Sequence, residues 1–134
     1  MKMRETSYRE EFLLDHVSIK SLWNQISTAN GLADWFAYNV EKEANQFTFF
    51  WDKRSMSVAF LVDSDPERFI SFQWEEPASD GVEVSFLSFE IVKAEISGAV
   101  SLLVRDDELS TGDPSANAIW SKHISQLKKS LGLT

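Results

Sequence analysis

Hydrophobic and polar positions alternate through the middle of the chain and recur at helical spacing near its end. The hydrophobic pattern predicts six strands: Tyr8–Leu14, which ends in an apolar run, Gln46–Asp52, which is apolar on both faces, and the segments Met56–Val62, Arg68–Glu75, Val82–Val92 and Ser97–Arg105, whose apolar residues alternate. In Val82–Val92 the apolar face changes near Ser85–Ser88, which predicts a bulge or a strong bend there. Turn residues recur at short intervals between these segments, and such spacing is typical of an antiparallel meander.

Three segments have the periodicity of helices. Ser18–Thr28 is amphipathic, and Asn30-Gly31 is expected to end it. Leu32, Trp35 and Phe36 predict a second short helix. The terminal helix starts at Asp113 as N-cap with Pro114 after it, and is about 18 residues or roughly 27 Å long. One apolar stripe runs along it, formed by Ala116, Ile119, Trp120, His123, Ile124, Leu127 and Leu131.

The order of these elements predicts an α+β fold. A first strand precedes two short helices, five or six further antiparallel strands and one long C-terminal helix. A strongly curved sheet wrapped around that helix would leave a space between them. Large rings on the concave face and on the helix would line this space.

Composition and charge narrow the possible functions. The 134 residues include 10 Phe and 5 Trp but 2 Tyr, 2 His and no Cys, so disulfides, thiolate metal sites and cysteine nucleophiles are excluded. The net charge of -8 disfavours nucleic acid and anionic membranes as partners. Met1–Glu11 does not resemble a signal peptide, and no apolar run is long enough to span a membrane. We therefore expect a cytoplasmic protein with one domain over residues 1–134 and no membrane insertion.

The candidate binding residues are the large rings and one histidine. They are Trp35, Phe36, Phe49, Trp51, Phe72, Trp74, Phe86, Phe89, Trp120 and His123. The same rings could instead fill an ordinary core, and periodicity does not separate a filled interior from a lined one. Tyr38, Gln73 and Arg105 are further polar candidates for orienting a ligand.

No motif for catalysis, metal binding or a cofactor is present in the sequence. There is no nucleophile elbow, phosphate-binding loop or dinucleotide fingerprint, and the two histidines lack acidic neighbours at ligand spacing. The acidic run Asp106-Asp107-Glu108 is interpreted as a solvated cluster in a loop before the terminal helix. We therefore expect no catalytic residues, no metal and no cofactor.

Several motifs resemble the START-like (SRPBCC) superfamily, in its branch similar to the activator of the heat-shock chaperone ATPase. Ser18–Ala37 contains Trp23, then Gly31-Leu32, then Trp35-Phe36, as the opening of that branch does. Arg68–Glu75 ends in a Trp, and the terminal helix has Trp120 followed by spaced leucines. One departure is Glu43-Ala44-Asn45-Gln46-Phe47, where the branch usually has a Gly-Gly-x-Phe turn.

The resemblance implies a helix-grip fold, in which a curved antiparallel sheet of six to seven strands wraps around the C-terminal helix. It also implies a small hydrophobic ligand, lipid-like or polycyclic, between sheet and helix. One alternative is a protein-interaction or co-chaperone-like module that uses its acidic surface. Another is a polyketide cyclase-like or hydrolase enzyme with His123 or a buried acid as the acid or base. The sequence leaves the oligomeric state open.

Overall fold

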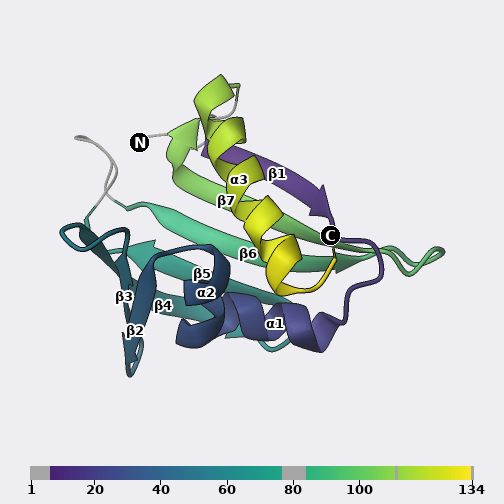
Figure 1. Ribbon diagram of the computed structural model, residues 1–134, viewed down its shortest axis with the longest axis horizontal. Coiled ribbons are helices and arrows are strands. Elements are labelled where there is room, and N and C mark those ends of the chain that lie inside the picture. The colour runs from purple at the N-terminus through teal and green to yellow at the C-terminus, as the bar shows by residue number, and fades with distance from the viewer. Residues whose placement is uncertain (1–6, 77–83, 111, 134) are drawn as a thin grey trace.

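Seven antiparallel strands form one sheet, and three helices lie on one of its faces (Figure 1). The computed structural model describes residues 7–76, 84–110 and 112–133. The strands are β1 (Ser7–Leu13), β2 (Asn39–Glu43), β3 (Gln46–Phe50), β4 (Met56–Asp65), β5 (Phe69–Trp74), β6 (Phe86–Lys93) and β7 (Val100–Ser110). The helices are α1 (Ile19–Ser27), α2 (Ala29–Trp35) and α3 (Pro114–Ser130). This α+β arrangement, with α3 across the sheet, confirms the predicted helix-grip fold.

The strand order places β1 and β2 at opposite edges of the sheet. The order is β1-β7-β6-β5-β4-β3-β2, so sequence neighbours pair throughout except that β1 pairs with β7. Because successive side chains in a strand point to opposite faces, one face carries Leu102 and Val104 of β7, Phe89 of β6 and Phe72 of β5. All four are fully buried, and this face packs against the helices.

Each helix begins at a residue whose side chain accepts a backbone N–H. Ser18 caps α1, Thr28 caps α2 and Asp113 caps α3. At the other end of α3, Gly132 has φ of 75° and its N–H donates to the Lys129 carbonyl, while Leu133 N–H donates to Lys128. This is a Schellman ending, and it stops the helix after Ser130.

The boundary between the first two helices differs from the expected one. It falls at Thr28, and Gly31 lies inside α2. A Cβ at position 31 would collide with the backbone of Asn24 and Gln25, so glycine is required for close packing of α2 on α1. The glycine therefore marks a helix contact and not a helix end.

Strand β2 was not predicted from the sequence. Its residues are mostly exposed, with only Val40 buried, so the alternation that identifies a strand is absent. A two-residue connection joins β2 to β3, and Ala44 in it has φ of 53°. Glycine normally adopts this left-handed conformation. The Gly-Gly-x-Phe pattern has a glycine at this position, where this chain has Ala44.

Two features of the last strands differ from those expected. Of the predicted bulge or strong bend near Ser85–Ser88, the bulge is absent from Phe86 to Glu90, where β5 and β6 pair in regular register, and the bend stays a prediction. Residues 82 and 83 of the predicted strand lie outside the described residues. The acidic run is not a solvated loop, since Asp106, Asp107 and Glu108 belong to β7 and the two aspartates are buried.

Candidate functional site

The candidate site lies where the end of α2, the end of β3 and the middle of α3 meet. Trp35 ends α2, and its Nε1 donates to the Gln25 carbonyl of α1 at 2.8 Å, which fixes the indole between the helices. Trp51 follows β3, and its Nε1 donates to Ser57 Oγ at 2.9 Å. The Phe36 ring lies between them, with centroids 5.5 Å from Trp35 and 5.4 Å from Trp51.

Behind these residues the space between helix and sheet is filled. Phe49, Phe72, Phe89 and Trp120 are 0–1% exposed. Trp120 stacks on Phe36 at 5.6 Å and meets Phe89 nearly edge-on at 6.0 Å. These four predicted lining residues therefore form core packing, with ring spacings typical of aromatic pairs.

A groove of about 440 Å³ opens at the surface in front of this packing. Its apolar wall is made by Trp35, Phe36, Trp51 and Ile119, and Tyr38 stands at its edge with 62% of its surface exposed. Asp34, Lys122, His123 and Gln126 supply the polar groups. Four of the ten predicted residues, Trp35, Phe36, Trp51 and His123, meet in this groove, and so does Tyr38 from the polar set.

His123 presents an imidazole to the groove from α3. Its ring lies 5.1 Å from Trp120 and 5.2 Å from Phe36. Burial lowers the pKa of His123, a hydrogen bond to the Trp35 backbone opposes that shift, and nearby Lys122 adds to it. The imidazole is therefore neutral at pH 7 and offers hydrogen bonding without charge.

Trp74 and Phe86 lie outside the groove. Trp74 lines a second hollow. The Trp51 ring, whose centroid is 6.2 Å from that of Trp74, lies between this hollow and the groove. Phe86 lies on the sheet face away from α3, because it alternates with the buried Leu87 and pairs with Gln73. Phe86 does not join the other predicted rings.

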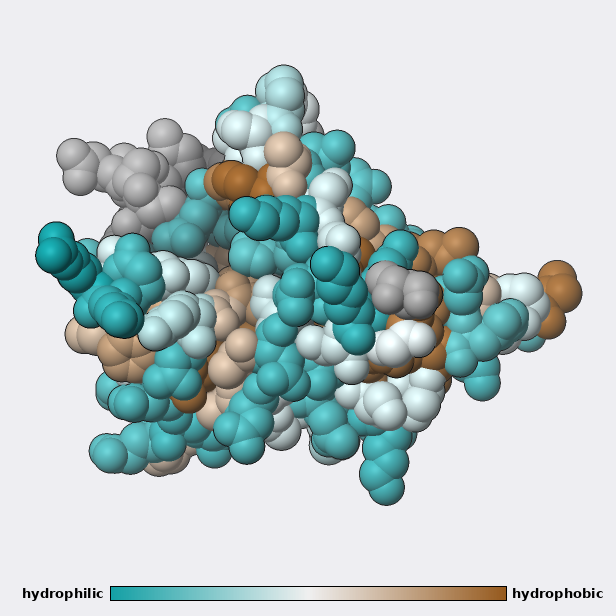
Figure 2. All heavy atoms as spheres, viewed as in Figure 1, coloured by the Kyte–Doolittle hydropathy of each residue, from teal (hydrophilic) through white to brown (hydrophobic). Residues whose placement is uncertain are grey.

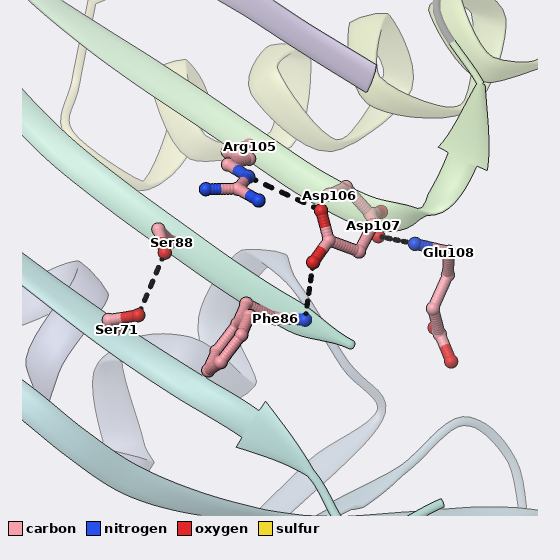
Figure 3. A network of polar contacts seen from close by, with 7 residues as sticks. All are labelled: Ser71, Phe86, Ser88, Arg105, Asp106, Asp107 and Glu108. Carbon is pink, nitrogen blue, oxygen red and sulfur yellow. Dashed lines mark hydrogen bonds and ion pairs between the residues drawn. The ribbon is translucent and has the colours of Figure 1, made fainter. Parts of the chain in front are cut away.

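Gln73 and Arg105 are also on this outer face. Figure 3 shows the polar contacts there: Arg105 Nε donates to Asp107 Oδ1 at 3.2 Å, and Phe86 N–H donates to Asp107 Oδ2 at 2.9 Å. Ser71 and Ser88 hydroxyls are 2.9 Å apart on neighbouring strands. These groups tie β5, β6 and β7 together, and Arg105 is part of that structural network.

The sequence interpretation missed a buried acid on the helix side of the sheet. Asp106 Oδ2 accepts a hydrogen bond from Trp120 Nε1 at 3.0 Å, and Oδ1 accepts one from Glu108 N–H at 2.9 Å. Burial raises the pKa of Asp106 against these bonds. Its neighbour Tyr8 is also buried, with its pKa raised to about 12, chiefly by burial. Alternation of Val100, Leu102 and Val104 continues to Asp106, so the pattern contained this information.

The described part of the chain contains neither a metal-ligand cluster nor a membrane-spanning helix. Within residues 7–76, 84–110 and 112–133, no three His, Asp or Glu side chains come together as a metal site needs. No helix of the described chain is long and apolar enough to cross a bilayer.

Solved structures with the same fold come from several bacteria. The solution NMR structure of BfR322 from Bacteroides fragilis is 29% identical, with a TM-score of 0.61, covering 93% of this chain and 91% of that one. The Aha1 dimer of Colwellia psychrerythraea is 14% identical with a TM-score of 0.71, covering 93% and 95%. DynU16, a putative protein in the dynemicin biosynthetic locus, is 14% identical with a TM-score of 0.71, covering 96% of this chain and 48% of its own.

Comparison by sequence identifies the family. No curated protein matches the chain at a significant level. The profile of the START-like superfamily domain matches residues 4–133, which is nearly the whole sequence. With seven strands around a C-terminal helix and a groove beside that helix, the chain belongs to the START-like superfamily.

Proposed function

We propose that this protein binds a small, largely apolar molecule with a flat ring system in the groove between α2 and α3. The observation that carries the proposal is the groove itself, about 440 Å³ of space with walls of Trp35, Phe36 and Trp51. Ligand sites of this kind are concave and mostly apolar, with a few polar groups that orient the ligand.

A flat ring system fits these walls better than a flexible chain does. Trp51 retains 36% exposure although Ser57 holds its indole, so a ligand can cover a surface that is already ordered. Contact with a pre-ordered ring loses little conformational entropy. The interior behind the groove is occupied by side chains, so a long acyl chain finds no tunnel along α3 among Phe49, Phe89 and Trp120.

The polar groups indicate where a ligand's own polar atom would lie. Neutral His123 stands beside Lys122 at the α3 wall, while Asp34 lies at the α2 wall. A carbonyl or hydroxyl on one end of the ligand would meet the His123 and Lys122 side. The START-like superfamily generally binds hydrophobic ligands, which supports the same class of ligand here.

Titration with N-phenyl-1-naphthylamine, an uncharged dye whose fluorescence rises in apolar sites, tests this proposal. Two isoleucines provide a matched pair: Ile119 is 43% exposed and lines the groove, whereas Ile96 is fully exposed in the β6–β7 connection. Figure 2 shows brown atoms at the tip of that hairpin, far from the groove.

We expect saturable binding of one dye molecule. Ile119→Gln should weaken it by about 1 kcal/mol, or roughly fivefold in Kd, because one apolar contact is lost. Ile96→Gln should leave the Kd unchanged. Absence of saturable binding, or an equal loss in both variants, would contradict the proposal.

A protein-interaction role is the second candidate, and one surface favours it. On β4, Met56, Phe60 and Val62 are 60%, 37% and 48% exposed. Neighbouring exposed apolar side chains are typical of protein contacts. A photo-crosslinking residue placed at Phe60 should then capture one discrete partner in cells, whereas the same residue at exposed Glu90 should not. Equal, diffuse crosslinking from both positions would count against this role.

A further inference from the structure

His123 lies in the groove where a bound ligand would meet its charge. It belongs to the middle of α3, lines the same wall as Ile119, and is half-buried. Water therefore still reaches the imidazole when the groove is empty of ligand. A flat apolar molecule bound in the groove would take the place of that water.

Aromatic rings surround the imidazole on its buried side. The ring centroids of Trp120, Phe36 and Trp35 lie 5.1, 5.2 and 6.4 Å from that of His123. All three of these side chains are buried. Such surroundings solvate a positive charge poorly, so an imidazolium at this position depends on water at the open side of the groove.

Titratable groups near His123 come from each element packed around it. On α3 itself Lys122 is adjacent, and its ammonium disfavours a second positive charge. On the opposite wall Asp34 of α2 is exposed, so water screens its carboxylate. Tyr38, after α2, stands at the edge of the groove, and Asp106 of β7 is buried and hydrogen-bonded in the interior. The groove therefore offers His123 no buried counter-ion among its described walls.

Protonation of His123 and occupation of the groove oppose each other. Burial, and then Lys122, lower the pKa of His123, while the hydrogen bond with the Trp35 backbone raises it. An uncharged ligand over the imidazole would remove further water and lower this pKa again. By thermodynamic linkage, a ligand that lowers the pKa of a group binds more weakly once that group is protonated.

We propose that acid releases the ligand from this groove, because protonation of His123 places a positive charge against the apolar surface of the ligand. This inference rests on the function proposed for the groove. Binding is at full strength above the pKa of His123 in the free protein. It weakens as the pH falls through that pKa, by up to about tenfold in Kd for each pH unit.

The chain offers a matched control, because its second histidine lies elsewhere. His16 is exposed between β1 and α1 and is not among the residues that line the groove. N-phenyl-1-naphthylamine, a diarylamine that stays uncharged in weak acid, is titrated at about pH 7.5 and about pH 5. The Kd of the parent protein should rise about threefold or more at the lower pH. His16→Gln should keep this rise, whereas His123→Gln should abolish it.

The imidazole C–H signals in the NMR spectrum provide a second measurement on the unaltered protein, and the two variants assign them. The pKa of His123 should be lower in the dye complex than in the free protein. This inference is overturned if the Kd is the same at both pH values, if His123→Gln keeps the pH dependence, or if the dye leaves the pKa of His123 unchanged or raises it. Absence of saturable binding at about pH 7.5 would instead contradict the function proposed for the groove, and this inference with it.

Discussion

Replacing Trp120 by Phe tests whether the buried pair of Trp120 and Asp106 holds α3 against the sheet. Trp120 is 1% exposed, and its Nε1 donates to Asp106 Oδ2 at 3.0 Å. Phenylalanine keeps a ring at this position but removes the donor. It leaves the Asp106 carboxylate with the Glu108 N–H as its remaining bond from the described residues.

Two effects set the magnitude. Loss of a hydrogen bond to a charged, largely buried group destabilises by about 1.5–3 kcal/mol. The smaller ring leaves about 35 Å³ unfilled, which adds about 1 kcal/mol. We therefore expect the free energy of unfolding to fall by about 3 kcal/mol. For a chain of 134 residues this corresponds to a Tm lower by about 10 °C.

The pH dependence has a definite sign. Burial raises the pKa of Asp106 above its ordinary 3.8, so the folded protein binds this proton more tightly than the unfolded chain does. Asp106 therefore contributes stability at low pH that is lost as the pH rises through its folded pKa. The hydrogen bond from Trp120 lowers the pKa of Asp106. Without this bond, the ionised form of Asp106 is even less favourable in the folded protein. The destabilisation by Trp120→Phe should be largest at neutral pH and shrink as the pH falls through the folded pKa.

Urea unfolding of both proteins at about pH 8 and at pH 3.8, the ordinary aspartate pKa that folded Asp106 exceeds, measures this difference. Trp23→Phe is the control, because Trp23 is half-buried, its indole has no hydrogen bond to any described residue, and the substitution removes the same atoms. The control should lose less than about 1 kcal/mol with no change between the two pH values. Equal losses in the two variants, or a Trp120→Phe loss that is independent of pH, would refute the reasoning.

Two further substitutions test the local backbone. Ala44→Gly should raise the free energy of unfolding by about 0.5–1 kcal/mol, because relief of the left-handed strain at φ of 53° exceeds the entropy that glycine gives the unfolded chain. Urea unfolding measures this change, and a loss of stability would contradict the prediction. Gly31→Ala should lower the free energy of unfolding by about 3 kcal/mol, since the new Cβ meets the backbone of Asn24 and Gln25 and forces α2 away from α1. A Tm within about 2–3 °C of that of the parent protein, which corresponds to about 1 kcal/mol or less, would show that the two helices are not so closely packed.

Strand alternation and helix capping were readable in the sequence because they depend on neighbouring residues. The Asp113-Pro114 start and Gly132 end of α3 are local signals, and the structure has both. Strand β2 was not readable, since Val40 is its only buried residue. Its place depends on pairing with β3, which no local pattern records.

The candidate site was predictable only in part. Alternation identified most of the rings that face the helices, although Phe86 lies on the other face of the sheet. The volumes of side chains from distant elements decide whether the rings fill or line the space. Phe89 and Trp120 fill it, whereas Trp51 and His123 border the groove. Asp106 was missed because its charge outweighed its place in the alternating pattern of β7.

Location of the bound ligand tests the central claim most directly. The five tryptophan indole signals of 15N-labelled protein are recorded with and without N-phenyl-1-naphthylamine. Binding in the groove predicts that the signals of Trp35 and Trp51, which line it, shift in proportion to occupancy, while that of Trp23 stays in place. Dye binding that leaves Trp35 and Trp51 unmoved would contradict the groove as the binding site.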